Sequence, residues 1–286
     1  MGLIVVSGAT GRLGGRIARQ LSADGVRQRL IVRDASRAPE LAGAAVAVAE
    51  YGDPEASRRA LDGAGTVLMV SAAETSDRVR RHRSFVDAAV AAGVERLVYT
   101  SFLGAAPDAV FTLARDHWAT EEHIRASGLE FTFLRDSLYA DFLPFLVGDD
   151  GVIRGPADSG RAAVVAQDDI ADAAVAVLRD PVPHAGKTYD LTGPEALTFA
   201  EMAATITAVT GRQVAFEDET LEQAYAARAS YGAPDWQVDA WVSTYTSVAA
   251  GELATVSPAV AELTGHPPIS LAELLVRDRP SRPSPR

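Results

Sequence analysis

The stretch LIVVSGATGRLG, residues 3–14, decides the fold that the sequence predicts. The apolar run over residues 3–6 is typical of a buried parallel strand. Glycines follow at positions 8, 11 and 14, and apolar residues at 13, 17 and 21 have the spacing of one helix face. A strand, a glycine turn and a helix N-terminus in this order form the dinucleotide-binding fingerprint of a Rossmann-type fold.

Each glycine of this fingerprint has a steric reason. Gly8 permits a tight turn, Gly11 lets the backbone approach a pyrophosphate, and Gly14 lets the helix lie close to its strand. The free N–H groups and the positive end of the helix dipole then face the phosphates. The alternative interpretation of this segment is a glycine-rich turn that binds no ligand. The residues that we expect to bind the cofactor here are Gly8, Thr10, Gly11, Arg12, Leu13 and Gly14.

Apolar runs that predict strands alternate with helical patterns along the first half of the chain. The later runs lie at 29–32, 44–49, 66–70, 95–99 and 131–134. This alternation predicts an α/β fold with a doubly wound parallel sheet. We expect a nucleotide-binding core over residues 1–135, a smaller C-terminal α/β substrate-binding region over 136–276 that is interleaved with it, and a disordered tail over 277–286.

The residues that end the predicted strands are candidates for cofactor binding, because ligands of such sheets bind outside the carboxyl ends of the strands. Arg33 ends the second strand, and its guanidinium favours the 2′-phosphate of NADP, so that NAD is the less favoured cofactor. Asp34 could instead point inward, toward the ribose. Ser71 and Ala72 end the fourth strand, and their small side chains leave room for the cofactor.

Asp53 and the basic run at 78–83 have two interpretations each. Asp53 is expected either to cap the helix that begins at Pro54 or to lie beside the adenine. The basic run is predicted to be a solvated helix face rather than part of a site.

Composition excludes several functional classes. A formal net charge of −11 argues against nucleic acid as a partner. The absence of cysteine excludes disulfides, thiolate catalysis and cysteine-bound metals, and we expect no metal site. No apolar stretch approaches the roughly 18 residues of a membrane span. With no signal peptide before the first strand, we expect a cytoplasmic protein that acts as a monomer or a homodimer on a small molecule.

Several short segments together resemble a known family. They are Thr10-Gly11-Arg12-Leu13-Gly14, Tyr99-Thr100-Ser101, His117-Trp118-Ala119-Thr120-Glu121, Ser127-Gly128-Leu129, Phe133-Leu134-Arg135, Leu263-Thr264-Gly265-His266-Pro267-Pro268 and Leu271-Ala272-Glu273. Over nearly the whole chain the sequence resembles the NmrA-like atypical short-chain dehydrogenases, and most of all the type 2 NAD(P)H:quinone oxidoreductases. The resemblance implies an NADPH-dependent reductase of quinones or similar flat, conjugated carbonyl compounds. The alternatives are a nucleotide-binding regulator without catalysis and a tailoring reductase or isomerase of an aromatic natural product.

The proton donor cannot be that of ordinary short-chain dehydrogenases, which use a tyrosine and a lysine four residues later. The single lysine, Lys187, follows no tyrosine at that spacing. A quinone takes up a hydride to give a phenolate-like anion, which a modest acid can protonate. We expect His117 to supply this proton, with Glu121 one helical turn later favouring its charged form. The alternative is that the two residues only pack and pair. Ser101, at the same sheet edge, is the second catalytic candidate.

The substrate side is expected after residue 136. The resemblance implies that Tyr139 and Phe142, in a predicted helix over 138–147, are stacking surfaces for a flat ring. We further expect a strand pair formed by 152–153 and 162–165, and a helix capped by Asp168 and Asp169. Capping boxes predict three later helices, through Thr198 with Glu201, Thr220 with Gln223, and Ser270 with Glu273. Trp236 and Trp241 are expected in a further helix, with their side chains in the hydrophobic core.

Overall fold

Seven parallel strands form the main sheet of the computed structural model, which describes residues 2–277. The strands are β1 (Leu3–Ser7), β2 (Gln28–Val32), β3 (Ala44–Val48), β4 (Ala64–Met69), β5 (Arg96–Phe102), β6 (Glu130–Asp136) and β8 (Lys187–Leu191). Their spatial order, β3-β2-β1-β4-β5-β6-β8, reverses direction between β1 and β4. The predicted doubly wound parallel sheet is confirmed, and its ligand site is expected at this reversal.

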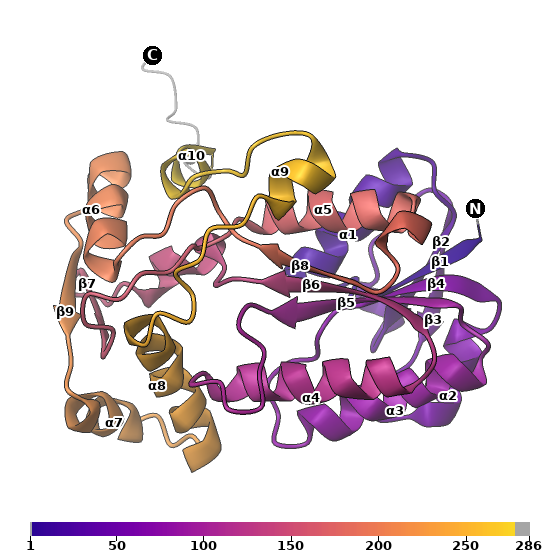
Figure 1. The fold of residues 1–286 in the computed structure, drawn as a ribbon, viewed down its shortest axis with the longest axis horizontal. Coiled ribbons are helices and arrows are strands. Elements are labelled where there is room, and N and C mark those ends of the chain that lie inside the picture. The colour runs from indigo at the N-terminus through magenta and orange to yellow at the C-terminus, as the bar shows by residue number, and fades with distance from the viewer. Residues whose placement is uncertain (1, 278–286) are drawn as a thin grey trace.

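Helices cover both faces of the sheet (Figure 1). One face carries α1 (Arg12–Ala23), α5 (Gln167–Arg179) and α9 (Ala259–Thr264). The other carries α2 (Pro54–Leu61), α3 (Arg78–Ala91) and α4 (Thr112–Ala126). Because side chains alternate along a strand, each strand supplies both cores. In β1, Ile4 and Val6 belong to the core under α1 and α5, whereas Val5 belongs to the core under α2 and α3.

A second group of elements lies beyond the carboxyl edge of the sheet (Figure 1). Its strands are β7 (Val152–Gly155) and β9 (Ala215–Asp218), which pair in parallel. Its helices are α6 (Phe199–Thr210), α7 (Leu221–Ala229), α8 (Asp235–Ala249) and α10 (Leu271–Arg277). Residues of α6, α8 and α10 share a separate hydrophobic core with β7. Strand β8 belongs to the main sheet and α5 to its helical layer, so the chain returns to the nucleotide-binding core after residue 136. The domain boundary at residue 135 stays a prediction.

Three short 3₁₀ helices complete the described chain: η1 (Ala35–Arg37), η2 (Ala140–Leu146) and η3 (Val182–His184). The predicted helix over 138–147 is wrong in type, because the segment forms η2 with Pro144 inside it. Proline has no N–H to donate and clashes with the preceding turn of an α-helix. The predicted pairing of 152–153 with 162–165 is also wrong: Ala162 forms a bridge with Leu197, and Val165 forms one with Tyr139.

The capping predictions have mixed outcomes. All three capping boxes are confirmed by reciprocal hydrogen bonds, including that of Ser270 with Glu273. Asp168 and Asp169 do not cap α5, because they lie in its first turn and Asp141 accepts the bond from the N–H of Gln167. Arg277, predicted to be disordered, is the last residue of α10. The rest of the predicted tail, 278–286, lies outside the described residues.

Candidate functional site

A cavity of about 280 Å³ lies at the carboxyl ends of β1, β2 and β4, where the sheet order reverses. Its lining residues are Gly8, Thr10, Gly11, Ile31, Val32, Arg33, Ala49, Glu50, Tyr51, Val70, Ser71, Ala72, Ala73, Thr75 and Arg81. We call it the nucleotide cavity. Of the sequence candidates for cofactor binding, it brings together Gly8, Thr10, Gly11, Arg33, Ser71 and Ala72.

The glycine turn has the geometry that the fingerprint requires. Gly8 has a φ of +65°, which L side chains rarely adopt. A Cβ at Gly14 would lie 2.4 Å from the carbonyl oxygen of Gly8, too close for any side chain. The N–H of Gly11 donates to the same oxygen at 2.9 Å. The backbone therefore forms a tight cradle at the N-terminus of α1, which requires glycine at position 14 and favours it at position 8.

Two arginines line the nucleotide cavity, Arg33 after β2 and Arg81 in α3. Asp34 does not compete with Arg33, because its carboxylate accepts from the N–H and hydroxyl of Ser36, at 2.9 and 2.7 Å, and so caps η1. Arg81 donates to Asp77 at 2.8 Å, which fixes its orientation. The expectation that the basic run at 78–83 is only a solvated face is wrong for Arg81, and also for the buried Arg78 and His82.

The loop after β3 supplies Glu50 and Tyr51 to the cavity, whereas Asp53 does not line it. Asp53 accepts from the N–H of Ala56 at 2.9 Å, so its predicted capping role is confirmed. The hydroxyl of Tyr51 donates to the carbonyl of Val70 at 2.7 Å and also bonds to Ser7. Burial raises the pKa of Tyr51, so it remains a neutral phenol that ties this loop to β1 and β4.

Two buried side chains of α3 clamp the peptide of Ala72. His82 accepts from the Ala72 N–H through Nε2 at 2.9 Å, and Arg78 donates to the Ala72 carbonyl at 3.0 Å. Burial, and then the charge of Arg78, lower the pKa of His82 well below its ordinary value. A neutral His82 is what this bond requires, because a protonated Nε2 could not accept it. The clamp therefore fixes the floor of the nucleotide cavity.

His117 is buried between Arg78 and Tyr99. Its Nε2 lies 2.9 Å from the guanidinium of Arg78, and its Nδ1 lies 2.9 Å from the hydroxyl of Tyr99. Because the guanidinium can only donate, Nε2 is the acceptor and the ring is neutral. Burial and the charge of Arg78 lower the pKa of His117 well below its ordinary value, so the predicted charged form of His117 is wrong.

The predicted pairing of His117 with Glu121 is wrong as well. Glu121 is fully buried and accepts from Arg135 at 2.9 and 2.7 Å, from Arg125 at 3.0 Å and from Ser101 at 2.6 Å. A buried carboxylate needs several strong donors, and two guanidiniums satisfy it better than one imidazole. Ser101, the second catalytic candidate, is held in this bond and does not line the nucleotide cavity.

The remaining fingerprint candidates lie outside the nucleotide cavity. Leu13 is in the hydrophobic core, and Gly14 is at the contact between α1 and the glycine turn. The guanidinium of Arg12 lies over the rings of Phe142 and Phe145, 5.5 and 5.2 Å from their centres. Arg12 thus joins the first turn of α1 to η2 by cation–π contacts.

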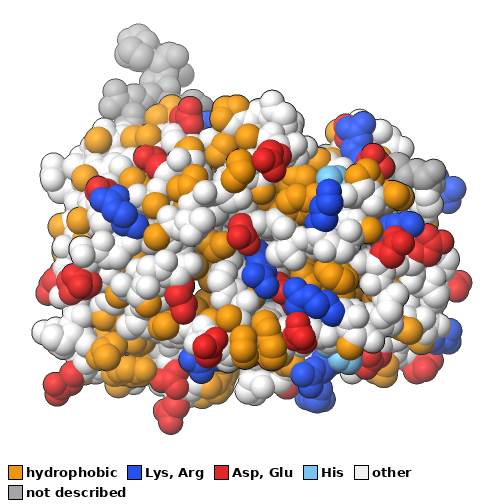
Figure 2. Space-filling view, in the orientation of Figure 1, with side chains coloured by type: hydrophobic (Ala, Val, Ile, Leu, Met, Phe, Trp, Pro, Cys, Tyr) orange, Lys and Arg blue, Asp and Glu red, His pale blue; other side chains and the backbone are white. Residues whose placement is uncertain are grey.

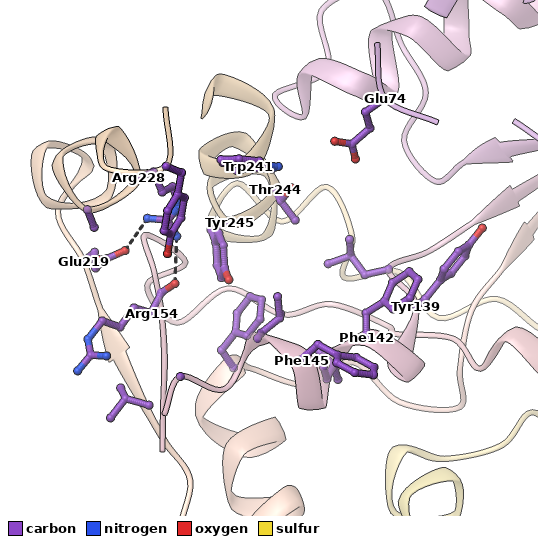
Figure 3. Close-up of a pocket in the computed structure, with 18 residues that line it drawn as sticks. Glu74, Tyr139, Phe142, Phe145, Arg154, Glu219, Arg228, Trp241, Thr244 and Tyr245 are labelled. Atoms are coloured by element: carbon purple, nitrogen blue, oxygen red, sulfur yellow. Dashed lines mark hydrogen bonds and ion pairs between the residues drawn. The ribbon is translucent and has the colours of Figure 1, made fainter. Parts of the chain in front are cut away.

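A second cavity, of about 600 Å³, lies between η2, β7, α7 and α8 (Figure 3). We call it the acceptor cavity. Its lining residues are Glu74, Leu138, Tyr139, Phe142, Leu143, Phe145, Leu146, Gly148, Val152, Arg154, Phe199, Glu219, Ala227, Arg228, Tyr231, Trp241, Thr244 and Tyr245. Most of these are aromatic or aliphatic, as is usual for a site that binds a small organic molecule. Both predicted substrate contacts, Tyr139 and Phe142, lie in its wall.

The far wall of the acceptor cavity is fixed by an ion pair. Arg228 donates to Glu219 at 3.0 Å and to the carbonyl of Arg154 at 3.2 Å (Figure 3). Trp241, predicted to lie in the core, packs against the hydrophobic cluster of Ala224 and Val238 and also lines this cavity from α8. Apolar side chains also reach the surface between charged ones on the face in Figure 2. Phe145 and Tyr231 are the most exposed of the lining aromatics, at 69% and 70%.

The loop of residues 71–75 is the border between the two cavities. Ser71, Ala72, Ala73 and Thr75 line the nucleotide cavity, whereas Glu74 lines the acceptor cavity. In Figure 3 the carboxylate of Glu74 points into the space between α8 and Phe142. The two cavities are therefore neighbours across a loop whose peptide at Ala72 is held rigidly by α3.

Sequence reasoning missed Arg78 and His82, although a signal for them exists. They are four residues apart and share the helix face of Phe85, Val86 and Ala89, so the helical pattern alone places them toward the core. No comparable signal identifies the acceptor cavity, because its walls come from segments between residues 74 and 245.

Among the described residues, no helix is long and apolar enough to cross a membrane, and no cluster of His, Asp and Glu is arranged to hold a metal ion.

Comparison with known proteins gives consistent matches. The sequence model of the NmrA-like family matches residues 1–232 of the chain. Quinone oxidoreductase 2 from Escherichia coli (strain K12) is 34% identical over 278 residues, which cover 95% of this chain and 96% of that protein. An NAD(P)H azoreductase from Xenophilus azovorans is 32% identical over 276 residues, which cover 95% and 96%. The crystal structure of the Escherichia coli NADPH-dependent quinone oxidoreductase complexed with NADPH aligns with a TM-score of 0.87 and 33% identity, over 96% of this chain and 99% of that one.

Proposed function

The chain belongs to the NmrA-like family, and we propose that it is an oxidoreductase that transfers a hydride from NADPH to a quinone or a similar flat conjugated carbonyl compound. One observation carries this proposal: a nucleotide cavity and an aromatic cavity adjoin across residues 71–75. A dinucleotide in the first cavity can therefore present its reactive ring to a flat molecule in the second. The likeness to quinone oxidoreductase 2 along nearly the full length of both chains supports the same reaction.

The nucleotide cavity fits NADPH. The cradle of Gly8 and Gly11 at the start of α1 would hold the pyrophosphate through backbone N–H groups. Arg33 and Arg81 would bind the 2′-phosphate, for which a guanidinium is suited, and this favours NADPH over NADH. Ser71 and Ala72 would support the cofactor at the border with the acceptor cavity. Bound NADPH supplies the hydride.

The acceptor cavity fits a flat conjugated molecule. Phe142 and Tyr139 lie 5.6 Å apart between ring centres and line the cavity together, with Trp241 and Tyr245 on the wall that α8 forms. Aromatic faces of this kind stack on planar rings. His117 and Ser101 are not proposed as catalytic groups in contact with the substrate, because neither lines the cavity.

The experiment that tests this function separates catalysis from regulation. Purified protein is mixed with NADPH or NADH and a series of benzoquinones and naphthoquinones, and the absorbance of the reduced nucleotide is followed. We expect quinone-dependent oxidation that is faster with NADPH than with NADH. Tight binding of NADPH, with oxidation no faster than in the absence of protein, would favour the regulator. Turnover of aromatic polyketide-like ketones but not of quinones would favour the tailoring reductase.

A further inference from the structure

The proposed quinone reduction needs a proton as well as a hydride. The hydride brings two electrons, oxidises the nicotinamide and leaves the quinone as a hydroquinone monoanion, whose phenolate oxygen must then take up one proton. His117 cannot deliver that proton directly, because it is neutral, buried against Arg78 and Tyr99, and outside the acceptor cavity. A different donor is therefore needed in the cavity wall, and the following inference rests on the proposed function.

Tyr139 and Asp136 form a hydrogen-bonded pair at the cavity wall. Tyr139 follows β6, and its ring lies beside that of Phe142, at the end of the cavity near Glu74 (Figure 3). Its hydroxyl lies 2.9 Å from Oδ2 of Asp136, the last residue of β6. Asp136 is only 1% exposed, and its Oδ1 is buried without a partner among the described residues. The phenol therefore stands between the cavity and a buried carboxyl group.

We propose that Tyr139 donates the proton to the reduced quinone and that Asp136 replaces it from the buried side. The bond from Tyr139 to Asp136 first reverses, so that the protonated Asp136 donates to the Tyr139 oxygen and the phenol hydrogen turns to the quinone. The O–H bond of Tyr139 then breaks as the second O–H bond of the hydroquinone forms. The carboxylic proton of Asp136 moves to the Tyr139 oxygen, so the tyrosine leaves the step as a neutral phenol. After the product departs, water that enters the cavity returns a proton to the pair through the half-buried Tyr139.

The electrostatic surroundings of the pair support a protonated carboxyl group. Burial raises the pKa of Asp136 well above its ordinary value, an effect that the hydrogen bond from Tyr139 only partly offsets. Burial, together with the hydrogen bond to Asp136 and the charge of Asp141, also raises the pKa of Tyr139, whereas the charge of Arg78 lowers it. A free phenolate is therefore costly here, and the two proton transfers are coupled.

Replacement of Tyr139 by phenylalanine tests the donor. Tyr139→Phe keeps the ring and removes the proton, so we expect kcat with a naphthoquinone to fall by about 100-fold, while KM changes by less than about twofold. The wild type is expected to show a solvent deuterium isotope effect on kcat that this variant changes. The matched control is Tyr225→Phe, which breaks a similar bond to Asp239, 3.0 Å long, outside both cavities. A kcat for Tyr139→Phe equal to that of the control would overturn the proposal.

Replacement of Asp136 by asparagine tests the proton store in two ways. Wild-type kcat is expected to fall with rising pH as Asp136 loses its proton, and Asp136→Asn is expected to lose this fall. The second readout needs no nucleotide. A raised pKa in the folded state means that stability is lost as pH rises from the ordinary aspartate value toward the folded one. Asp136→Asn should therefore unfold at a higher temperature than the wild type at neutral pH, and the difference should vanish in acid.

The failure of this inference differs from the failure of the proposed function. No quinone turnover by the wild type would contradict the function itself, and with it the donor role of Tyr139. Normal wild-type turnover, with Tyr139→Phe unaffected, would contradict only the donor. Equal pH dependence of stability in the wild type, Asp136→Asn and the control Asp239→Asn would contradict a protonated Asp136.

Discussion

The two cavities of this protein are specified in different ways. The nucleotide cavity depends on backbone geometry, because it is built around a glycine turn and strand ends, and all its lining residues, including the side chains of Arg33 and Arg81, lie within residues 8–81. The acceptor cavity is formed by side chains that come from η2, β7, α6, α7 and α8, up to residue 245. A backbone site tolerates almost no added atom, whereas a wall of many side chains shares its contacts among them. Small changes should therefore have large effects on stability and ligand binding in the first cavity and modest effects on ligand binding in the second, where the hydroxyl of Tyr139 is expected to affect kcat rather than binding.

The largest effect is expected from a single added carbon in the glycine turn. In Gly14→Ala the new Cβ would meet the carbonyl oxygen of Gly8 at 2.4 Å, so α1 and β1 must move apart. We expect a loss of about 3 kcal/mol in the free energy of unfolding, measured with urea. NADPH binding, followed by fluorescence titration, should be lost. Gly65→Ala is the matched control, because its Cβ would lie at an ordinary 3.8 Å from Gly2. Equal stability of the two variants would contradict the backbone account.

The next effect concerns nucleotide choice. Arg33→Ala and Arg81→Ala should each weaken NADPH by about 30-fold, the usual consequence of removing a charge-assisted hydrogen bond. NADH, which lacks the 2′-phosphate, should be affected little. Arg83→Ala, an exposed change in the same basic run, is the control. The measurement is the dissociation constant of each nucleotide for each variant. If a variant weakens NADPH and NADH equally, the arginine that it lacks does not bind the 2′-phosphate.

A smaller effect is expected when a whole ring is removed from the acceptor cavity. Phe142→Ala should raise KM for a naphthoquinone by about fivefold, the scale of one lost aromatic contact. The dissociation constant of NADPH should stay unchanged, because Phe142 does not line the nucleotide cavity. Steady-state kinetics and a nucleotide titration measure the two quantities. A collapse of NADPH binding in this variant would show that the two cavities are not built independently.

The smallest effect on catalysis is expected at His117. His117→Gln keeps an acceptor for Arg78 but cannot titrate, and we expect the pH profile of kcat to keep its shape. Its effect should appear in stability instead. Because the folded state lowers the pKa of His117, the wild type should lose stability as pH falls below about 6.5, where the unfolded chain takes up the proton. His117→Gln should lose less stability in acid, as measured by thermal unfolding. A flattened pH dependence of kcat in His117→Gln would contradict this expectation and indicate that His117 is the proton donor.

Sequence patterns predicted the backbone-defined part of the molecule well. The fingerprint at 3–14 and the strand-ending residues Arg33, Ser71 and Ala72 all lie where a local rule places them, because strand ends of a parallel sheet share one edge. His117 shows the limit of such rules. Its spacing from Glu121 predicts a pair, yet the partners of both are set by neighbouring elements, Arg78 in α3 and Arg135 in β6. Burial and competition between donors cannot be derived from spacing on one helix.

The acceptor side was predictable only through resemblance. Tyr139 and Phe142 were expected as substrate contacts, but nothing near them in the sequence indicates that Arg228, Trp241 and Tyr245 complete the same cavity. The pair of Asp136 and Tyr139 was equally hidden, since a buried acid at a strand end and a tyrosine three residues later have no distinctive pattern. Such contacts arise from tertiary packing, and only the folded chain shows them.

The central claim is that the two cavities bring a nicotinamide and a quinone together across residues 71–75. Single-turnover oxidation of NADPH by a naphthoquinone, with deuterium placed in turn at each of the two hydrogens on C4 of the nicotinamide ring, tests it most directly. One face of the ring must look into the acceptor cavity, so we predict that only one of the two labels slows the reaction. Equal slowing by both labels, or by neither, would contradict the claim.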